Sequence, residues 1–413
     1  MVTLRGELGA FCLARPLPPA SRSEHARNER RIVNAEVSVV FAPQEPPDAW
    51  AAAVFLAGPS PRAADVPSWR PAAVAELRRR WKGPGRLVVF APEPQDGWHG
   101  DYLGQVDWEE RCLHLADEVV FYVPRDLDTL PGFTTNVEFG MWHASGRAVF
   151  GAPPDAPKNR YLLHHAVRSG MPVAEDLPGT VAAALERIGT GAVRSGGERE
   201  VPLLVWREPS FRRWYAAQRG AGNVLLGARL VWRLPVKGRP AAFWALSVRV
   251  LVAAEDRVKD GEVVLGRPDV SAVVLYRPRP TLDETEIVLV REFRAPGAAP
   301  DGFVQEPPGG SGPGGPVETA LAEVVEETGL VLAADRLRPC GTRQVAATLS
   351  AHRAHVYAAE ITDAELARLR AAGPLGVAAD GEVTQVEITT YGELCRDGRA
   401  DWSVLGMVSA ALR

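Results

Sequence analysis

Short apolar runs alternate with segments of helical spacing along residues 36–190. The runs typical of strands are 37–42, 53–58, 87–92, 118–124 and 147–153. Helical patterns occur at 69–82, 108–117, 137–145, 158–169 and 180–188. Such alternation indicates a parallel sheet with helices on both faces, which is a doubly wound α/β domain. Ligands bind such sheets at the carboxyl ends of the strands, so we expect a site at the loops after Gly58, Pro92 and Pro124.

A second region of strands and helices follows the glycine-rich stretch 189–197. Strand-like runs occur at 243–252, 261–265, 270–276 and 286–290, and helical patterns at 318–329, 389–394 and 402–412. We expect these elements to form an α/β/α sandwich. The predicted organisation is an N-terminal extension (1–35), the doubly wound domain (36–190), a linker (191–205) and the sandwich domain (206–413).

Three glutamates share one face of the helix predicted at 318–329. Glu323, Glu326 and Glu327 stand at positions i, i+3 and i+4, and Gly329 can take the left-handed conformation that ends a helix. Carboxylates this close repel one another unless a cation lies among them, and magnesium prefers oxygen ligands. A solvated acidic helix face is the alternative interpretation. The glycine-rich loop 307–310 ahead of the helix favours the metal site.

This stretch resembles the signature of the Nudix hydrolases, G-x5-E-x7-R-E-U-x-E-E-x-G-U, where U is aliphatic. The match is complete from Glu323 to Leu330, whereas Ala322 replaces the arginine and Gly314 falls at the earlier glutamate. The resemblance implies a substrate with a nucleoside diphosphate linkage. It also implies a Mg²⁺ ion, or Mn²⁺ in its place, bound by the three glutamates. Because the arginine of the family helps to hold the glutamates, its absence argues against turnover but not against the fold.

Residues 288–294 and 303–310 resemble the ADP-ribose pyrophosphatase branch of that family. The resemblance implies that Glu306 joins the metal ligands and that a glutamate of a late loop, Glu382 here, is the catalytic base. Arg291 or Arg294 is suited to pair with a diphosphate, because a guanidinium offers a planar fork of donors. An equal alternative is that both are surface arginines on a strand.

In the first domain, a glutamate closely follows a strand end within residues 134–147. A carboxylate in the first turn of a helix at this place would face the binding cleft. There it can attack an anomeric carbon or stabilise an oxocarbenium-like centre. The candidate is Glu138. The alternative is a capping box, in which Glu138 only returns a hydrogen bond to Thr135.

The segment from about 54 to 161 resembles the nucleoside 2-deoxyribosyltransferases. The shared features are a strand that ends in a loop at Gly58, an acidic residue ahead of a strand led by Asp117, and a Glu-x-Gly helix start at Glu138. The resemblance implies that Glu138 is the nucleophile. It also implies that an upstream acid contacts the substrate, and this acid is Glu109 or Asp107.

The resemblance also suggests residues that bind the substrate. Gly58 and Pro59 form the loop after the second strand, and Asp117 and Asn136 flank the strand and helix that carry the nucleophile. Trp98 lies in the loop after the third strand, where its ring is a candidate for stacking on a base. Packing of Trp98 onto the core is an equal alternative.

The composition excludes several classes of partner. The 413 residues are 46% hydrophobic and 24% charged, which is ordinary for a globular protein. The net charge of −4 argues against nucleic acid or an anionic membrane surface as partner. No apolar run approaches the length of a membrane span and no signal-peptide pattern is present, so we expect a cytoplasmic protein. The four cysteines are scattered, which fits reduced thiols.

The two resemblances together predict a nucleotide-processing enzyme with a small-molecule substrate. In this hypothesis the Nudix-like domain releases a nucleoside monophosphate, and the first domain cleaves the bond between base and sugar of a nucleoside or nucleoside monophosphate. Water or a second base would resolve the sugar–enzyme intermediate. The alternative is that the Nudix-like half binds a nucleotide as a sensor or recruiting module. A homo-oligomer is also implied, since relatives of the first domain commonly build their sites in oligomers.

Overall fold

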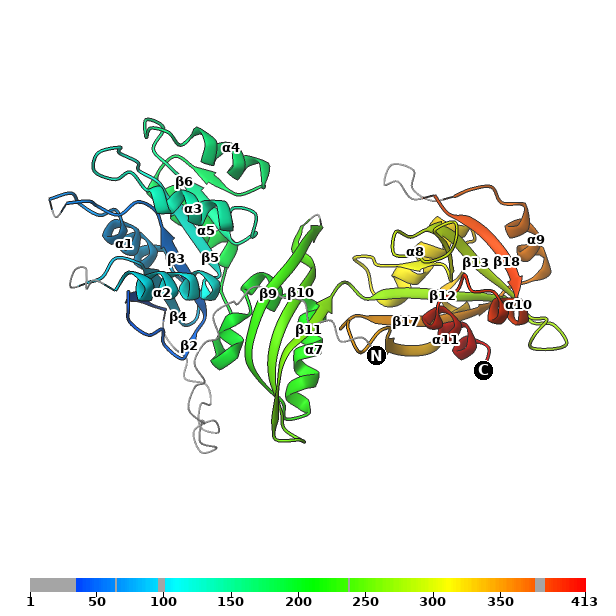
Figure 1. The fold of residues 1–413 in the computed structure, drawn as a ribbon. Helices are drawn as coiled ribbons and strands as arrows, with labels where there is room; N and C mark the ends of the chain where they lie inside the picture. Colours follow the sequence, from blue (N-terminus) through cyan, green and yellow to red (C-terminus); the bar gives the residue numbers. More distant parts are fainter. Residues whose placement is uncertain (1–34, 64, 96–100, 237, 376–382) are drawn as a thin grey trace.

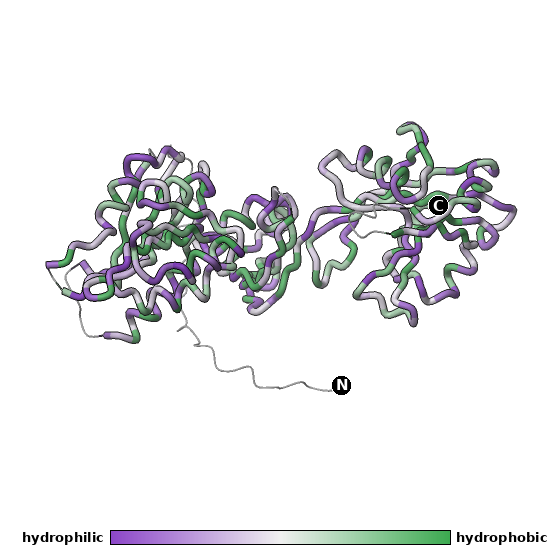
Figure 2. The backbone as a smooth tube through the Cα atoms, turned by 90° about the horizontal axis from the view of Figure 1, so that it is seen from above, coloured by the Kyte–Doolittle hydropathy of each residue, from purple (hydrophilic) through white to green (hydrophobic). Residues whose placement is uncertain are grey.

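The computed structural model describes residues 35–413 apart from 64, 96–100, 237 and 376–382 (Figure 1). Three larger sheets follow one another along this part of the chain: a parallel sheet, an antiparallel sheet and a mixed sheet. Figure 1 shows the antiparallel sheet between the other two. Figure 2 shows the hydrophobic stretches of the N-terminal unit gathered in its interior, with hydrophilic stretches toward the outside.

The N-terminal sheet has the order β1-β4-β3-β5-β6-β7, and the pairs along it are parallel. Its strands are β1 (Glu36–Phe41), β3 (Ala52–Ala57), β4 (Arg86–Ala91), β5 (Glu118–Tyr122), β6 (Ala148–Gly151) and β7 (Val173–Ala174). The predicted doubly wound parallel sheet is therefore confirmed for this region.

Alternate residues of the sheet face two different cores. Phe55 of β3 packs with α2, α3 and α4, whereas its neighbours Val54 and Leu56 pack with α1 and α5. Because both faces are covered, β3 and β4 are almost completely buried, as is typical of parallel strands. The helices are α1 (Arg70–Arg80), α2 (Tyr102–Leu115), α3 (Phe133–Trp142), α4 (Arg160–Arg168) and α5 (Leu177–Ile188).

The chain then forms three long antiparallel strands with a core of their own. They are β9 (Val224–Val236), β10 (Arg239–Val252) and β11 (Arg257–Gly266). One face packs against α7 (Pro209–Gly220), where the rings of Phe211 and Trp244 lie 5.8 Å apart. The structure therefore divides residues 206–413, which the sequence pattern assigns to one domain, between two sheets.

The predicted linker, residues 191–205, is built into the first domain. It contains β8 (Arg194–Ser195), which pairs with β2 (Ala49–Trp50), then a short 3-10 helix and the start of α6 (Leu203–Trp206). The guanidinium of Arg194 is fully buried and donates to both carboxylate oxygens of Asp117, at 2.8 and 2.5 Å. Asp117 also accepts hydrogen bonds from the backbone N–H groups of Ala53 and Leu203, both at 2.9 Å. This ionic contact fixes the segment to the sheet.

The C-terminal sheet is mixed and lies between two layers of helices. Its strands are β12 (Val270–Arg277), β13 (Glu286–Phe293), β14 (Phe303–Glu306), β15 (Gly309–Gly310), β16 (Arg338–Gln344), β17 (Arg353–Glu360) and β18 (Gln385–Thr390). The helices α8 (Pro316–Thr328) and α9 (Asp363–Ala371) pack on one face, and α10 (Tyr391–Arg396) and α11 (Trp402–Ala411) on the other. This layering is the one expected of an α/β/α sandwich, but layering alone does not identify a family.

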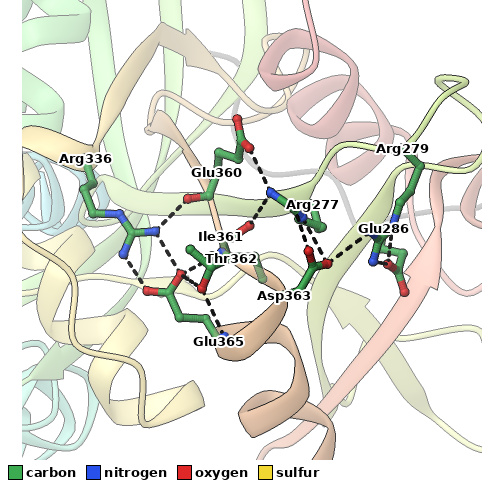
Figure 3. A network of polar contacts seen from close by, with 9 residues as sticks. All are labelled: Arg277, Arg279, Glu286, Arg336, Glu360, Ile361, Thr362, Asp363 and Glu365. Carbon is green, nitrogen blue, oxygen red and sulfur yellow. Dashed lines mark hydrogen bonds and ion pairs between the residues drawn. The ribbon is translucent and has the colours of Figure 1, made fainter.

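A network of arginines and carboxylates holds the start of α9 against the mixed sheet (Figure 3). Thr362 and Glu365 form a capping box, and Glu365 also accepts a hydrogen bond from Arg336 at 2.6 Å. Arg277 of β12 pairs with Asp363 at 2.8 Å. Each exposed ion pair contributes little to the free energy of unfolding, so the main effect of the network is to fix the direction of α9.

The buried pair at Asp117 yields a stability prediction. Asp117→Asn should lower the free energy of unfolding by about 3–5 kcal/mol, because it leaves the guanidinium of Arg194 buried without its counter-ion. Urea unfolding at neutral pH measures this change. The control is Asp128→Asn, the same substitution at an exposed position, which should shift stability by less than about 0.5 kcal/mol. Equal stabilities for the two variants would contradict this role.

Candidate active site

Charged side chains gather where the central parallel strands end. Gly58 follows β3, Glu93 follows β4, and Arg70 opens α1. Glu109 comes from α2 and Glu138 from α3. These positions agree with the prediction of a site at the carboxyl ends of the strands, because the loops after Gly58 and Pro92 are among those that bring the groups together.

The guanidinium of Arg70 lies at the base of this group and is only 3% exposed. It donates to the backbone carbonyls of Leu56 at 3.1 Å and Gly58 at 2.7 Å, and it forms an ion pair with Glu93. Sequence reasoning missed Arg70. A signal was present, because a cation in the first turn of a helix is disfavoured by the helix dipole and needs a special partner.

Glu138 and Glu109 influence each other's ionisation. Burial raises the pKa of Glu138 to about 7, with a further increase from the negative charge of Glu109 and a partial decrease from Arg70. Burial also raises the pKa of Glu109, and the hydrogen bond from Gln105 and the charge of Arg70 offset part of that rise. The side-chain amide of Gln105 donates to Glu109 at 2.6 Å and to the carbonyl of Pro92 at 2.7 Å, which orients the carboxylate.

The helix that carries Glu138 begins without a side-chain cap. Gly132 precedes α3 in the left-handed conformation, with φ of 62°, and no side chain bonds to the first turn. The capping-box interpretation of Thr135 and Glu138 is therefore wrong, because Thr135 already lies inside the helix. Glu138 also lies in the second turn and not in the expected first turn. Its carboxylate is thus not required to begin the helix.

The Gly58-Pro59 loop shapes the floor of the site. A Cβ atom at Gly58 would overlap the carbonyl oxygen of Tyr122 and lie 2.7 Å from the ring of Trp69. The carbonyl of Pro59 accepts a hydrogen bond from the indole of Trp69 at 3.1 Å, and this indole meets the ring of Tyr122 edge to face at 5.4 Å. Glycine is therefore required at position 58 by close packing.

Asn136 is engaged with the loop that precedes α3. Its side-chain oxygen accepts a hydrogen bond from Arg125 at 2.6 Å, and Arg125 also donates to Asn159 at 3.1 Å. Asn159 in turn donates to the carbonyl of Val123 at 2.9 Å. This chain of contacts runs from the end of β5 to α3, so Asn136 helps to position the helix that carries Glu138.

Two further sequence-based candidates, Asp117 and Asp107, do not join this group. Asp117 stands just before β5, at the amino end of the sheet, and all its described contacts are structural, which corrects its assignment to substrate binding. Asp107 is exposed on α2, whereas Glu109 is partly buried, so the structure favours Glu109 as the upstream acid. Trp98 lies outside the described residues.

Comparison with known families supports the resemblance found in the N-terminal domain. Residues 51–156 match the family model described as nucleoside 2-deoxyribosyltransferase like. The match contains Gly58, Arg70, Glu93, Glu109 and Glu138. A search of curated proteins finds no match. The deoxyribosyltransferase-like region indicates an enzyme that acts on nucleosides, and the comparisons give no support to the Nudix resemblance.

The glutamates of α8, which were expected to share one face, differ in their burial. Glu327 is 8% exposed and accepts a hydrogen bond from the backbone of Gly309 at 2.9 Å. Burial raises the pKa of Glu327 to about 8, and the nearby charges of Glu323 and Glu292 raise it further. Glu326, by contrast, is exposed to solvent.

The two arginines proposed to bind a diphosphate are paired with carboxylates. Arg294 contacts Glu306 and Glu292, both at 2.9 Å, and Arg291 contacts Asp301 at 2.8 Å. In the described part of the chain, no group of three or more His, Cys, Asp or Glu side chains could hold a metal ion. The binding of Mg²⁺ by Glu323, Glu326, Glu327 and Glu306 therefore stays a prediction. Glu382 lies outside the described residues.

The described helices also bear on membrane association. None of them is both long and apolar enough to cross a bilayer.

The pKa of Glu138 predicts how Glu138→Gln changes stability with pH. A carboxyl with a raised pKa stabilises the fold fully below about pH 4.5, and this contribution is lost as pH rises through about 7. When the pH rises from 5 to 8, the free energy of unfolding of Glu138→Gln should therefore increase by about 1–2 kcal/mol relative to that of wild type. Denaturant unfolding at both pH values measures the difference. Glu110→Gln, at an exposed position of α2, is the control, and an equal change in the two variants would contradict the raised pKa.

Proposed function

We propose that the deoxyribosyltransferase-like domain cleaves the N-glycosidic bond of a nucleoside, with Glu138 as the nucleophile. The observation that carries the proposal is the electrostatic interaction of Glu138 with both Glu109 and the buried guanidinium of Arg70. This group lies at the carboxyl ends of a parallel sheet, the usual place for a ligand in this architecture. The segment also matches a family of enzymes that act on nucleosides.

The two carboxyl groups take different roles in this mechanism. Ionised Glu138 attacks the anomeric carbon, a carbon–oxygen bond forms, and the bond to the base nitrogen breaks. The electron pair goes to the base nitrogen, which takes up a proton from solvent, and Glu109, oriented by Gln105, is placed to hydrogen-bond the substrate. Arg70 opposes the rise in the pKa of Glu138 and so helps it to ionise.

The charge of the site favours a nucleoside over a nucleoside monophosphate. Glu93, Glu109 and Glu138 surround one guanidinium, that of Arg70, which already pairs with Glu93. A phosphate placed here would meet more negative than positive charge, and the mutual repulsion would weaken its binding. A developing positive charge on the sugar would instead be stabilised. Water or a second base then releases the sugar from Glu138.

Glycosidic cleavage is tested by incubating the purified protein with each common nucleoside and measuring base release by chromatography. Glu138→Gln should reduce the rate by at least about 10³-fold, since an amide cannot act as the nucleophile. Asp107→Asn should leave the rate nearly unchanged, whereas Glu109→Gln should lower it. Base exchange upon addition of a second base would identify a transferase. Full activity in Glu138→Gln would refute the assignment.

For the C-terminal domain, we propose nucleotide binding without turnover in preference to magnesium-dependent cleavage of a nucleoside diphosphate conjugate. Ala322 stands where the related hydrolases have an arginine. Arg294 is already paired with Glu306 and Glu292, and the described acidic residues do not converge on one metal position.

A titration with ADP-ribose and MgCl₂ separates binding from cleavage. Calorimetry should detect saturable binding, and chromatography of the same sample should show no monophosphate. Arg291→Gln should weaken binding about tenfold if this guanidinium meets the diphosphate. Release of a monophosphate by wild type, with loss in the Glu326→Gln/Glu327→Gln double variant, would overturn the proposal and establish cleavage.

A further inference from the structure

A cavity of about 380 Å³ lies at the amino end of the parallel sheet, opposite the end that carries Glu138. Its walls come from the start of β5, the end of α5, α6, the start of α7 and the hairpin between β9 and β10. This volume falls within the range of small-molecule sites. The cavity therefore joins the parallel sheet to the antiparallel sheet and shares no residue with the candidate active site.

Glu118, the first residue of β5, lines this cavity and carries a buried acceptor that is unsatisfied. The residue is 5% exposed, and one of its carboxylate oxygens accepts a hydrogen bond from Arg187 at 2.9 Å. The other oxygen, Oε2, is buried and has no hydrogen-bond partner among the described residues. A buried acceptor left in this state costs about 1–3 kcal/mol, so a donor supplied from outside the chain would be bound favourably.

Two guanidinium groups supply positive charge to the same cavity. Arg207 donates to the carbonyls of Arg187 at 3.0 Å and of Ile188. No ion pair of Arg207 occurs within the described residues, so its positive charge is not neutralised by a bound carboxylate. Arg239 pairs with Glu208 but keeps 38% of its side chain exposed. The cavity thus offers an acceptor and two cations, and its other carboxylates, Asp117 and Glu208, are each paired with an arginine.

The remaining walls are largely apolar. Ile188, Leu203 and Pro240 contribute side chains without hydrogen-bonding groups, and such walls suit a flat ring. A ligand that satisfies all three features carries a planar body, an N–H donor and an anionic group. A sugar phosphate lacks the planar body.

We propose that this cavity binds a nucleoside monophosphate, with an amino group of the base donating to Oε2 of Glu118 and the phosphate between Arg207 and Arg239. A carboxylate is a natural acceptor for the exocyclic amine of cytosine, and guanidinium groups bind phosphate well. The site is distinct from that of Glu138, because Glu118 begins β5 whereas the Gly58 loop adjoins Tyr122 at its other end. Four residue steps along a strand span roughly 13 Å.

The probe is dCMP, titrated calorimetrically into full-length Glu138→Gln protein so that turnover does not interfere. We expect one site per chain. Deoxycytidine, which lacks the phosphate, and deoxyribose 5-phosphate, which lacks the base, should each bind at least tenfold more weakly. Equal affinity of deoxyribose 5-phosphate would show that the cavity is only an anion site. Absence of saturable dCMP binding up to millimolar concentration would overturn the proposal.

Variants place the binding site within the protein. Glu118→Gln replaces the acceptor oxygen with an amide of similar size, and Arg239→Gln removes one cation at the exposed rim. Each should weaken dCMP binding at least tenfold, whereas Arg168→Gln, on exposed α4, should not. If Glu118→Gln fails to fold, Arg239→Gln still carries the test. Unchanged affinity in Arg239→Gln would refute the site, whatever the outcome for base release at Glu138.

Discussion

The guanidinium of Arg70 is buried where β3 ends, and a charge removed from water must be paired or it costs several kcal/mol. Glu93 supplies the counter-charge, and the carbonyls of Leu56 and Gly58 take up further N–H groups. Those contacts require the chain to turn tightly after β3. The close packing at Gly58 is the consequence, since its backbone approaches the carbonyl of Tyr122 too closely for any side chain. The hydrogen bonds and the ion pair of the buried Arg70 thus determine the shape of the candidate site.

A second buried arginine, Arg194, forms a similar ion pair at the other end of the sheet. Arg194 enters from the segment after α5 and binds Asp117 at the start of β5, and Asp117 also accepts from the backbone of Ala53 and Leu203. The interior between the two arginines is apolar. The sheet is therefore held by hydrophobic packing in its centre and by hydrogen-bonded ion pairs at its ends. Because Leu203 begins α6, the same pair also fixes where the antiparallel unit leaves the domain.

Much of the first domain could be predicted because its strands are continuous apolar runs and its helices have clear periodicity. Glu138 could be found because it follows a strand end, and the neighbouring loops were expected at the same edge. Arg70 is harder to find, because its place in the first turn of a helix is only a weak signal, and an arginine among helical residues looks like any surface cation until its burial is known. Asp117 was misassigned for a related reason. The sequence shows an acidic residue at a strand but not which oxygen acceptors and donors surround it.

The end of the first domain was harder to predict because its contacts are between distant residues. Arg194 lies 77 positions from Asp117, and nothing local in residues 191–205 indicates that pairing. The three-stranded sheet is also hard to recognise in the sequence. Its long strands β9 and β10 bury apolar residues against one helix, but many polar residues lie between those apolar positions. Local pattern indicates strands at 243–252 and 261–265 but not at β9, and it does not show that they form a unit separate from the mixed sheet.

The charge of the candidate active site constrains how the halves of the chain can cooperate. Direct transfer of a monophosphate from the C-terminal domain to Glu138 would bring a dianion toward three carboxylates that share one guanidinium. Such a transfer works against electrostatic repulsion that increases as the site excludes water. A monophosphate is better matched to the amino end of the sheet, where Arg207 and Arg239 line the cavity beside Glu118. Cooperation through binding at that cavity is therefore physically easier than passing a phosphorylated product to Glu138.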